Sequence, residues 1–269
     1  MLEGVPASPR REPHDRGPLL ARVYRTGTIP LAMRTVILCG GKGTRAYPHT
    51  TQVPKPLLEV AERPVLQHVM ESYAAQGFTS FVLAAGFKIE LIDEFARTLP
   101  SGWDVDVVDT GEDTNTGGRI ARCRDRMGDT FFATYSDGLS DIDLRALQEF
   151  HEGHDGTATL TTVPLPSQYG TIVFGEDRRV SLFREKPVLG DHWINGGFFV
   201  FDQAAFEHWA GEDLERDVLP ALGAEGALYA YQHRGFWKSM DTYKDALELT
   251  ALVVEGKGPW TRSGTPASS

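Results

Sequence analysis

A glycine-rich turn that is followed by two cations is the part of this sequence best suited to chemistry. The stretch "LCGGKGTRAYPHTTQVPKPLLEV", residues 38–60, places Gly40, Gly41 and Gly43 directly after a short apolar run. Glycines let backbone N–H groups approach oxygen atoms closely, which makes a concave site for an anion. Arg45 and Lys55 add positive side chains farther along the loop. The pattern is typical of a loop that binds phosphate, although a glycine-rich surface turn with two solvated cations has the same composition.

Two familiar nucleotide-binding loops fit this stretch poorly. A Walker A loop has its lysine after the last glycine, whereas here Lys42 precedes Gly43. A dinucleotide-binding loop is followed at once by a helix whose N-terminus holds the pyrophosphate. Pro48, Pro54 and Pro56 exclude that helix, because proline lacks the backbone donor and restricts the residue before it. The sequence therefore predicts an extended phosphate-binding loop.

Alternating apolar runs and helix-like stretches predict the elements that position this loop. Strand-like runs cover residues 35–38, 81–84, 105–108 and 131–135, and helix-like stretches cover residues 65–75, 89–95, 118–127 and 144–150. Such alternation favours βαβ units. The expected fold class is α/β, with a Rossmann-like mixed, mainly parallel sheet flanked by helices. The second half is rich in β-like runs, at residues 158–165, 170–175, 179–186 and 194–202, before a last helix over residues 241–254.

Composition limits the possible partners. The chain of 269 residues has a formal net charge of −10, which argues against binding nucleic acid or an anionic membrane. No stretch approaches 18 consecutive apolar residues, so a transmembrane helix is not expected. Cys39 and Cys123 are the only cysteines, which fits a reducing compartment, and a cytoplasmic location is expected.

The two ends of the chain differ from its middle. Residues 1–32 are rich in proline, arginine and acidic residues and show no periodicity, so they are interpreted as a disordered arm or a misplaced start before Met33. Residues 33–260 are expected to form one catalytic domain. Residues 261–269 are expected to be a flexible tail.

Further motifs turn these observations into a resemblance. "GGKGTR", "PKPLLEV", "VDTGEDTNTGGRI", "YSDG", "FREKP", "INGGFFV", "GFWKSMDTYKD" and "GKGPW" follow one another along residues 33–260. In this order they resemble the sugar-1-phosphate nucleotidylyltransferases, and among these the cytidylyltransferases that make CDP-glucose from CTP. The resemblance implies a nucleotide-diphospho-sugar transferase fold with a β-rich C-terminal half. It also implies an enzyme that takes CTP and a sugar 1-phosphate, expected to be α-D-glucose 1-phosphate, and releases pyrophosphate.

The resemblance assigns a Mg²⁺ site to Asp137 and Asp241. Asp137 lies in "YSDG" at the end of a predicted strand, and open α/β sheets bind ligands at the carboxyl ends of their strands. Mg²⁺ prefers one or two carboxylates together with phosphates and water. Taken alone, Asp137 could equally be a turn residue before Gly138, and Asp241 could be a helix N-cap.

The remaining roles implied by the resemblance fall into three groups. Arg45, Lys55 and Lys186 are the expected catalytic cations, which would neutralise phosphate charge. The expected nucleotide-binding residues are Leu38, Gly40, Gly41, Gly43, Thr44, Thr114, Arg119 and Ser136. The expected sugar-phosphate-binding residues are Gly170, Glu185, Lys186 and Asn195. Glu185 and Lys186 can serve one ligand only if their strand ends there, and Pro187 predicts that end.

One departure and several alternatives remain open. The region at residues 99–108 is shorter than in the resembled enzymes, so a homo-oligomer is expected without a defined number of subunits. The same reaction with dTTP, UTP or GTP, or with another phosphorylated sugar, is the main alternative. A catalytically silent nucleotide-sensing subunit and a nicotinamide-dependent oxidoreductase fit less well, because Lys55, Asp137 and Asp241 are all present and prolines follow the glycines.

Overall fold

The computed structural model describes residues 33–43, 50 and 52–262. The chain divides into two units, Met1–Pro30 and Leu31–Ser269, and the first lies outside the described residues. The predicted arm at residues 1–32, the end of the predicted tail, and the site residues Thr44 and Arg45 also lie outside them. The domain boundaries expected at residues 32 and 260 therefore stay predictions.

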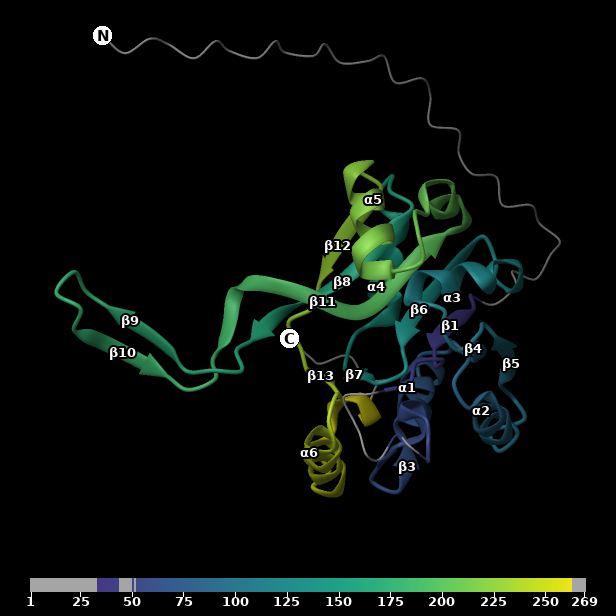
Figure 1. The fold of residues 1–269 in the computed structure, drawn as a ribbon, viewed down its shortest axis with the longest axis horizontal. Helices are drawn as coiled ribbons and strands as arrows, with labels where there is room; N and C mark the ends of the chain where they lie inside the picture. Colours follow the sequence, from purple (N-terminus) through teal and green to yellow (C-terminus); the bar gives the residue numbers. More distant parts are fainter. Residues whose placement is uncertain (1–32, 44–49, 51, 263–269) are drawn as a thin grey trace, which may run out of the picture. The chain divides into compact units, whose positions relative to one another are not determined.

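A mixed seven-stranded sheet organises the second unit (Figure 1). Its order is β12 (Leu228–Gln232), β8 (Ala158–Pro166), β11 (Val188–Asp202), β6 (Thr130–Tyr135), β1 (Thr35–Leu38), β4 (Ser80–Ala85) and β5 (Asp104–Asp109). The β1–β4, β1–β6, β4–β5 and β8–β12 pairs are parallel, whereas β11 is antiparallel to both of its neighbours. The predicted mixed, mainly parallel sheet and strand-rich C-terminal half are confirmed.

Helices cover both faces of this sheet. The helices are α1 (Val65–Ala74), α2 (Ile89–Ala96), α3 (Thr116–Arg122), α4 (Leu144–Glu152), α5 (Leu219–Ala224) and α6 (Tyr243–Val254). Helices α1, α2, α4 and α6 contribute to the hydrophobic cluster that contains Ile37 and Phe132. Helices α3 and α5 contribute to a second cluster, which contains Val36 and Phe131. Because successive strand side chains point to opposite faces, a continuous apolar run such as Thr35–Leu38 fills both clusters.

Short elements complete the fold around the sheet. The two-stranded pairs are β2 (Glu59–Val60) with β3 (Arg63–Pro64), β7 (Gly138–Ser140) with β13 (Trp237–Ser239), and β9 (Thr171–Phe174) with β10 (Val180–Arg184). The 3-10 helices are η3 (Lys55–Leu57), η4 (Arg124–Arg126), η5 (Gln203–His208) and η7 (Pro259–Arg262), and η6 (Leu214–Val218) is a π-helix. In the described part of the chain, no helix has the length and apolar character needed to cross a membrane.

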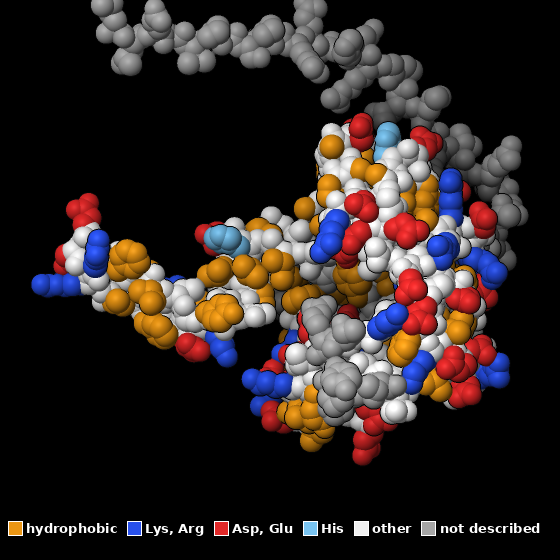
Figure 2. Space-filling view, viewed as in Figure 1, with side chains coloured by type: hydrophobic (Ala, Val, Ile, Leu, Met, Phe, Trp, Pro, Cys, Tyr) orange, Lys and Arg blue, Asp and Glu red, His pale blue; other side chains and the backbone are white. Residues whose placement is uncertain are grey.

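The β8 and β11 strands continue past the sheet as a two-stranded ribbon. They pair from Phe201 with Ala158 as far as Val188 with Pro166, and the β9–β10 hairpin follows at the far end (Figure 1). Apolar side chains are exposed along the hairpin, including Phe174 at 65% and Phe183 at 59% (Figure 2). The ribbon thus leaves apolar surface uncovered that the body of the domain would bury.

Candidate active site

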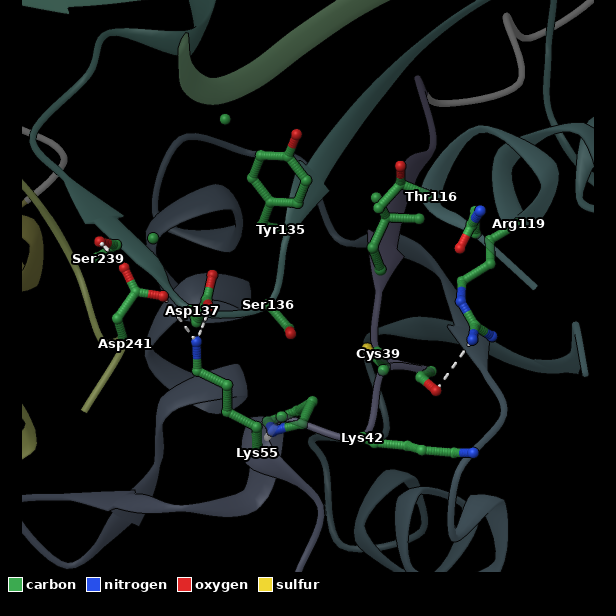
Figure 3. Close-up of a pocket in the computed structure, with 18 of the residues that line it drawn as sticks. Cys39, Lys42, Lys55, Thr116, Arg119, Tyr135, Ser136, Asp137, Ser239 and Asp241 are labelled. Carbon is green, nitrogen blue, oxygen red and sulfur yellow. Dashed lines mark hydrogen bonds and ion pairs between the residues drawn. The ribbon is translucent and has the colours of Figure 1, made fainter. Parts of the chain in front are cut away.

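A cavity of about 820 Å³ opens where β1 and β6 end (Figure 3). The predicted site residues that line it are Leu38, Gly40, Gly41, Gly43, Lys55, Thr114, Arg119, Ser136, Asp137, Asn195 and Asp241. The parallel β1–β6 pair brings Leu38 beside Tyr135, which precedes Ser136 and Asp137. Because β11 is antiparallel to β6, its Asn195–Gly197 segment reaches the same edge of the sheet. Sheet topology therefore assembles residues that are more than 150 positions apart in the sequence.

The glycine loop requires two of its glycines for close packing. A Cβ on Gly40 would lie 1.9 Å from a guanidinium nitrogen of Arg119, so that position admits no side chain without movement. Gly43 has a φ of +60°, in the left-handed region, and a Cβ there would lie 2.6 Å from the Cβ of Lys55. No α-helix begins among the described residues between Gly40 and α1. Lys55 instead begins the short 3-10 helix η3, which the sequence did not predict.

The buried Lys55 side chain connects the two carboxylates that the sequence assigned to a metal. Its Nζ lies 2.5 Å from Asp137 Oδ2 and 3.2 Å from Asp241 Oδ1 (Figure 3). Pro54 and Pro56 flank Lys55 in η3, and this rigid turn directs the lysine into the cavity. The ammonium group of Lys55 therefore occupies a position where two carboxylates hold a positive charge.

Asp241 is positioned by its neighbours and does not cap a helix. Helix α6 has Thr242 as its N-cap, in a capping box with Asp245, so the alternative reading of Asp241 as the N-cap is wrong. Ser239 donates a hydrogen bond to Asp241 Oδ2 at 2.9 Å. The backbone N–H of Met240 donates to the carbonyl of Asp137 at 2.9 Å, which ties the two aspartates together.

These two aspartates fit a magnesium ion. Their oxygens already surround a cation, the Lys55 ammonium, and both line the cavity. Within the described residues, no cluster of three or more histidine, cysteine or acidic side chains could hold a metal by itself. Two carboxylates with the remaining ligands supplied by phosphate and water are what Mg²⁺ commonly takes in proteins. Asp137 and Asp241 would then be its protein ligands.

Arg119 lines the cavity but acts within the protein as a brace. Its guanidinium donates to the Thr110 hydroxyl at 2.7 Å and to backbone carbonyls. Those carbonyls belong to Gly40, Ala85, Gly111 and Glu112. Thr114 is also engaged internally, because its hydroxyl donates to the Thr110 carbonyl at 2.5 Å. Direct contact of either side chain with a nucleotide therefore stays a prediction. The hydrogen bonds show that Arg119 connects the glycine loop at Gly40 to the loop at residues 110–112.

Across the mouth of the cavity, Lys42 bridges two loops. Its Nζ lies 2.9 Å from Glu112 Oε1 and 3.1 Å from Asp113 Oδ1. These hydrogen-bonded acidic partners raise the pKa of Lys42, so it stays positively charged. Exposed ion pairs of this kind add little stability, and the bridge can open for a ligand at small cost.

The cavity also contains polar residues that sequence reasoning missed. The Tyr135 hydroxyl donates to the Glu215 carboxylate, and Thr116 donates to the other oxygen of that carboxylate at 2.9 Å. Asn195, which was expected at the sugar site, donates to the Tyr135 hydroxyl at 3.2 Å. Desolvation, followed by the neighbouring Glu215, raises the pKa of Tyr135, so the phenol remains protonated. The position of Tyr135, two residues before Asp137, is the one sequence signal that could have identified it. Glu215 lies in a run of acidic residues that is typical of a solvated surface, so nothing in the sequence singled it out.

Three of the predicted sugar-phosphate-binding residues lie beside the β9–β10 hairpin and not in the cavity. Gly170, Glu185 and Lys186 are absent from the described residues that line the cavity. They cluster at the base of the β9–β10 hairpin, where a Cβ on Gly170 would lie 3.1 Å from Glu185 Oε2. The strand β10 ends at Arg184 and Lys186 has a φ of +45°, so the expected break before Pro187 is confirmed. The cavity of a single chain therefore lacks them.

Comparison with known proteins identifies the family. The nucleotidyl transferase family matches residues 34–255. A protein of Bacillus subtilis named "Probable glucose-1-phosphate cytidylyltransferase" is 37% identical over 253 residues, covering 85% of this chain and 99% of its own length. The "Mannose-1-phosphate guanylyltransferase catalytic subunit beta" of Danio rerio is 33% identical over 83% of this chain and 65% of its own.

A solved structure gives the same answer for the fold. The crystal structure of HddC from Yersinia pseudotuberculosis superposes with a TM-score of 0.66 at 23% identity, covering 82% of this chain and 99% of HddC. Likeness at that identity concerns the fold, and it agrees with the seven-stranded sheet and flanking helices described above. The match over residues 34–255 includes every described residue that lines the cavity. This chain belongs to the nucleotidyl transferase family and is a sugar-1-phosphate nucleotidyltransferase.

Proposed function

We propose that this enzyme transfers a cytidylyl group from CTP to α-D-glucose 1-phosphate, giving CDP-glucose and pyrophosphate. The observation that carries the reaction type is Lys55 held between Asp137 and Asp241 in the cavity. The choice of CTP and glucose rests on the family resemblance and on the name of the Bacillus subtilis relative. The guanylyltransferase from Danio rerio supports the alternative, the same reaction with another nucleoside triphosphate or another sugar phosphate.

The chemistry is a displacement at the α-phosphorus of the nucleotide. An oxygen of the sugar 1-phosphate attacks this phosphorus, and a new P–O bond forms. The bond to the bridging oxygen breaks, and pyrophosphate leaves with that electron pair. Such transfers depend on positioning and on neutralising charge, with little covalent work by the protein. A bound Mg²⁺ would supply a Lewis acid that neutralises phosphate charge.

The described side chains contribute to this reaction in distinct ways. The Lys55 ammonium neutralises charge that develops on the transferring phosphate. Backbone around Gly40, Gly41 and Gly43 comes close enough to the cavity to meet the triphosphate. Asp137 and Asp241 would hold Mg²⁺, and Lys55 would then pair with the incoming phosphates. Arg45 is assigned a second positive charge on the triphosphate by the family resemblance, and it lies outside the described residues.

Pyrophosphate release tests this function. Purified enzyme with Mg²⁺ and glucose 1-phosphate is assayed with CTP, dTTP, UTP and GTP in turn, and release with CTP alone is expected. Lys55→Met should lower turnover about 10²- to 10³-fold, because an interaction with the developing charge is lost. Lys244→Met, at an exposed position on α6, is the matched control and should keep wild-type turnover. Release with a different triphosphate would reassign the base, and near-normal turnover of Lys55→Met would overturn the mechanism.

We also propose that the enzyme works as a homo-oligomer in which the β9–β10 hairpin packs on another copy. A two-stranded hairpin without further support is marginally stable in water, and here Ile172, Phe174 and Phe183 are exposed. Large exposed apolar patches mark interaction surfaces. The same ribbon carries Glu185 and Lys186, which the cavity of its own chain lacks. A neighbouring copy would therefore supply the sugar-phosphate residues that complete each site.

Subunit complementation tests this arrangement. Lys55→Met and Lys186→Met are each expected to be inactive. Hybrids obtained by co-expression should regain a fraction of wild-type activity, because some cavities then combine an intact Lys55 with an intact Lys186 from another copy. Hybrids of Lys55→Met with Asp137→Asn are the control and should regain none, because both residues belong to one chain's cavity. If the Lys55→Met and Lys186→Met hybrids form but stay inactive, Lys186 does not act in trans.

The proposed compartment is the cytoplasm. Cys39 and Cys123 are free thiols, and both are buried. Burial raises the pKa of each thiol, so neither is expected to react readily. Free thiols without a disulfide are the usual state in a reducing compartment, which supports this assignment.

A further inference from the structure

The segment that carries Glu215 is unusually well fixed for an acidic surface stretch. Asp213 accepts hydrogen bonds from the backbone N–H groups of Glu215 at 3.1 Å and Arg216 at 2.9 Å. Asp217 accepts from the backbone N–H of Asp213 at 3.0 Å. The turn before it needs a glycine, because Gly211 has a φ of +65°. Asp213 and Asp217 therefore stabilise the π-helix η6, whereas the side chain of Glu215 between them takes no part in these hydrogen bonds. Turns of π-helix are often found at functional sites.

The Glu215 carboxylate is directed into the cavity and held there by two hydroxyls. Tyr135 donates to one carboxylate oxygen and Thr116 to the other. The Thr116 hydroxyl in turn accepts from the backbone N–H of Leu214 at 3.0 Å, which joins η6 to the start of α3. A carboxylate has about four lone-pair positions, so two hydroxyl donors leave capacity for a ligand.

Close packing fixes the Tyr135 ring as well. Gly197 has a φ of +79°, and a Cβ there would lie 2.5 Å from the ring. Phe199 contacts the same ring edge to face, with ring centroids 5.8 Å apart. Asn195 donates to the phenol oxygen at 3.2 Å, and its own side-chain oxygen accepts from the Gly197 N–H at 2.7 Å. The position of the phenol therefore does not depend on the ligand.

The charge of Glu215 decides which part of a substrate it can meet. A carboxylate repels phosphate oxygens, and the ammonium groups of Lys55 and Lys42 pair with carboxylates other than Glu215. Figure 3 shows Tyr135 between Asp137 and Asp241 on one side and Thr116 and Arg119 on the other. The substrate groups between a base and its phosphates, or beyond the phosphates, are sugar rings. Their hydroxyls are neutral donors, and a carboxylate accepts from them strongly.

We propose that Glu215, oriented by Tyr135 and Thr116, is a specificity residue that binds two adjacent hydroxyls of a sugar ring. The ring is either the ribose of the nucleotide or the hexose of the sugar phosphate, since Thr116 neighbours the expected nucleotide residues and Asn195 belongs to the expected sugar site. The inference rests on the proposed nucleotidyl transfer. It adds a residue to that site which sets the preference for hydroxylated substrates.

Paired substrates with and without a hydroxyl test the proposal. Values of kcat/KM are measured for CTP against 2′-deoxy-CTP and 3′-deoxy-CTP, and for glucose 1-phosphate against its 2-deoxy and 3-deoxy analogues. Wild-type enzyme should prefer the hydroxylated member in one arm by about tenfold or more, the effect of a hydrogen bond to a charged group. Glu215→Gln should bring that ratio close to one, and Tyr135→Phe should lower it severalfold. The arm that responds identifies the ring.

A control and a second readout separate the possible failures. Glu212→Gln changes the same charge on the same segment, at a side chain outside the cavity lining, and should keep the wild-type ratios. Affinities of CMP and its deoxy analogues, and of the sugar phosphates, are measured by calorimetry without turnover. Unchanged ratios and affinities in both arms for Glu215→Gln would overturn the proposal while leaving nucleotidyl transfer intact. Should that variant fail to fold, Tyr135→Phe decides by the same criterion, and absence of pyrophosphate release by the wild type would count against the function itself.

Discussion

The cavity and the base of the β9–β10 hairpin both carry predicted site residues but differ in how these residues are supported. In the cavity, Arg119 braces two loops, Lys55 links two aspartates, and Tyr135 is packed against Gly197. On the hairpin, Phe174 and Phe183 are exposed. Lys186 at its base has a positive φ and is also exposed, so no packed core surrounds that residue. Precise positioning in one chain is thus confined to the sheet edge. The hairpin has the character of a surface that requires a partner.

The largest expected effect separates the two regions by stability. Phe131 is fully buried and contacts the rings of Phe201 and Phe206, so Phe131→Ala should lower the free energy of unfolding by about 3–5 kcal/mol. Phe183→Ala removes the same ring from a position that is exposed in the single chain. At protein concentrations low enough to dissociate the proposed oligomer, it should change the free energy of unfolding by about 0.5 kcal/mol or less. Urea denaturation at several protein concentrations measures both. A comparable loss for the two variants would mean that the hairpin is part of the folded core.

A smaller effect is expected inside the cavity, between two neighbouring glycines. In Gly40→Ala the new Cβ would meet the buried Arg119 guanidinium at 1.9 Å, and the brace between the loops must shift. A loss of roughly 1–3 kcal/mol in unfolding free energy is expected from that disruption. Gly41→Ala is the matched control, because its Cβ would meet no atom within 4 Å. Equal thermal midpoints for the two variants would show that Arg119 does not brace this loop.

The smallest effect is a pH dependence that belongs to the body of the domain. Burial lowers the pKa of His68 below its ordinary value of 6.5, and desolvation lowers the pKa of His154 in the same direction. The unfolded chain therefore binds protons that the folded chain excludes. Stability should be complete above about pH 6.5 and fall as the pH drops toward the lowered folded values. Urea denaturation between about pH 8 and pH 5.5 measures the slope, and His68→Gln should make it shallower.

The sequence predicted the sheet strands of the first half well, and for a clear reason. Strands such as Thr35–Leu38 and Thr130–Tyr135 are buried on both faces, so their apolar character is visible without knowledge of their partners. The strand Leu228–Gln232 was missed, because it is a short edge strand whose residues are nowhere fully buried. Thr242 was missed as the cap of α6 for a different reason. Asp241 beside it is an equally good capping residue by type, and the geometry alone chose between them.

The site was predictable where motif spacing carried it and not where distant segments meet. Lys55, Asp137 and Asp241 follow from recognisable motifs, and the structure brings them within hydrogen-bonding distance. Glu215 contacts Tyr135 across 80 positions, and no local pattern signals that meeting. Gly170, Glu185 and Lys186 also follow from motifs. A motif does not state which copy of the chain a residue serves, however, and the ribbon carries these three away from their own cavity.

The sequence by itself predicted the alternation of strands and helices and the proline-bounded glycine loop, because these depend on residue types at short spacing. The reaction type followed from the resemblance of its motifs to a known family. Only the tertiary structure decided which residues that are distant in the sequence come into contact. It set the Lys55 ammonium between two carboxylates, committed Arg119 to backbone carbonyls and directed Glu215 into the cavity. Such contacts arise from strand order and from antiparallel β11, which bring distant segments to one edge of the sheet. Long-range pairing of this kind leaves no periodic trace in the chain.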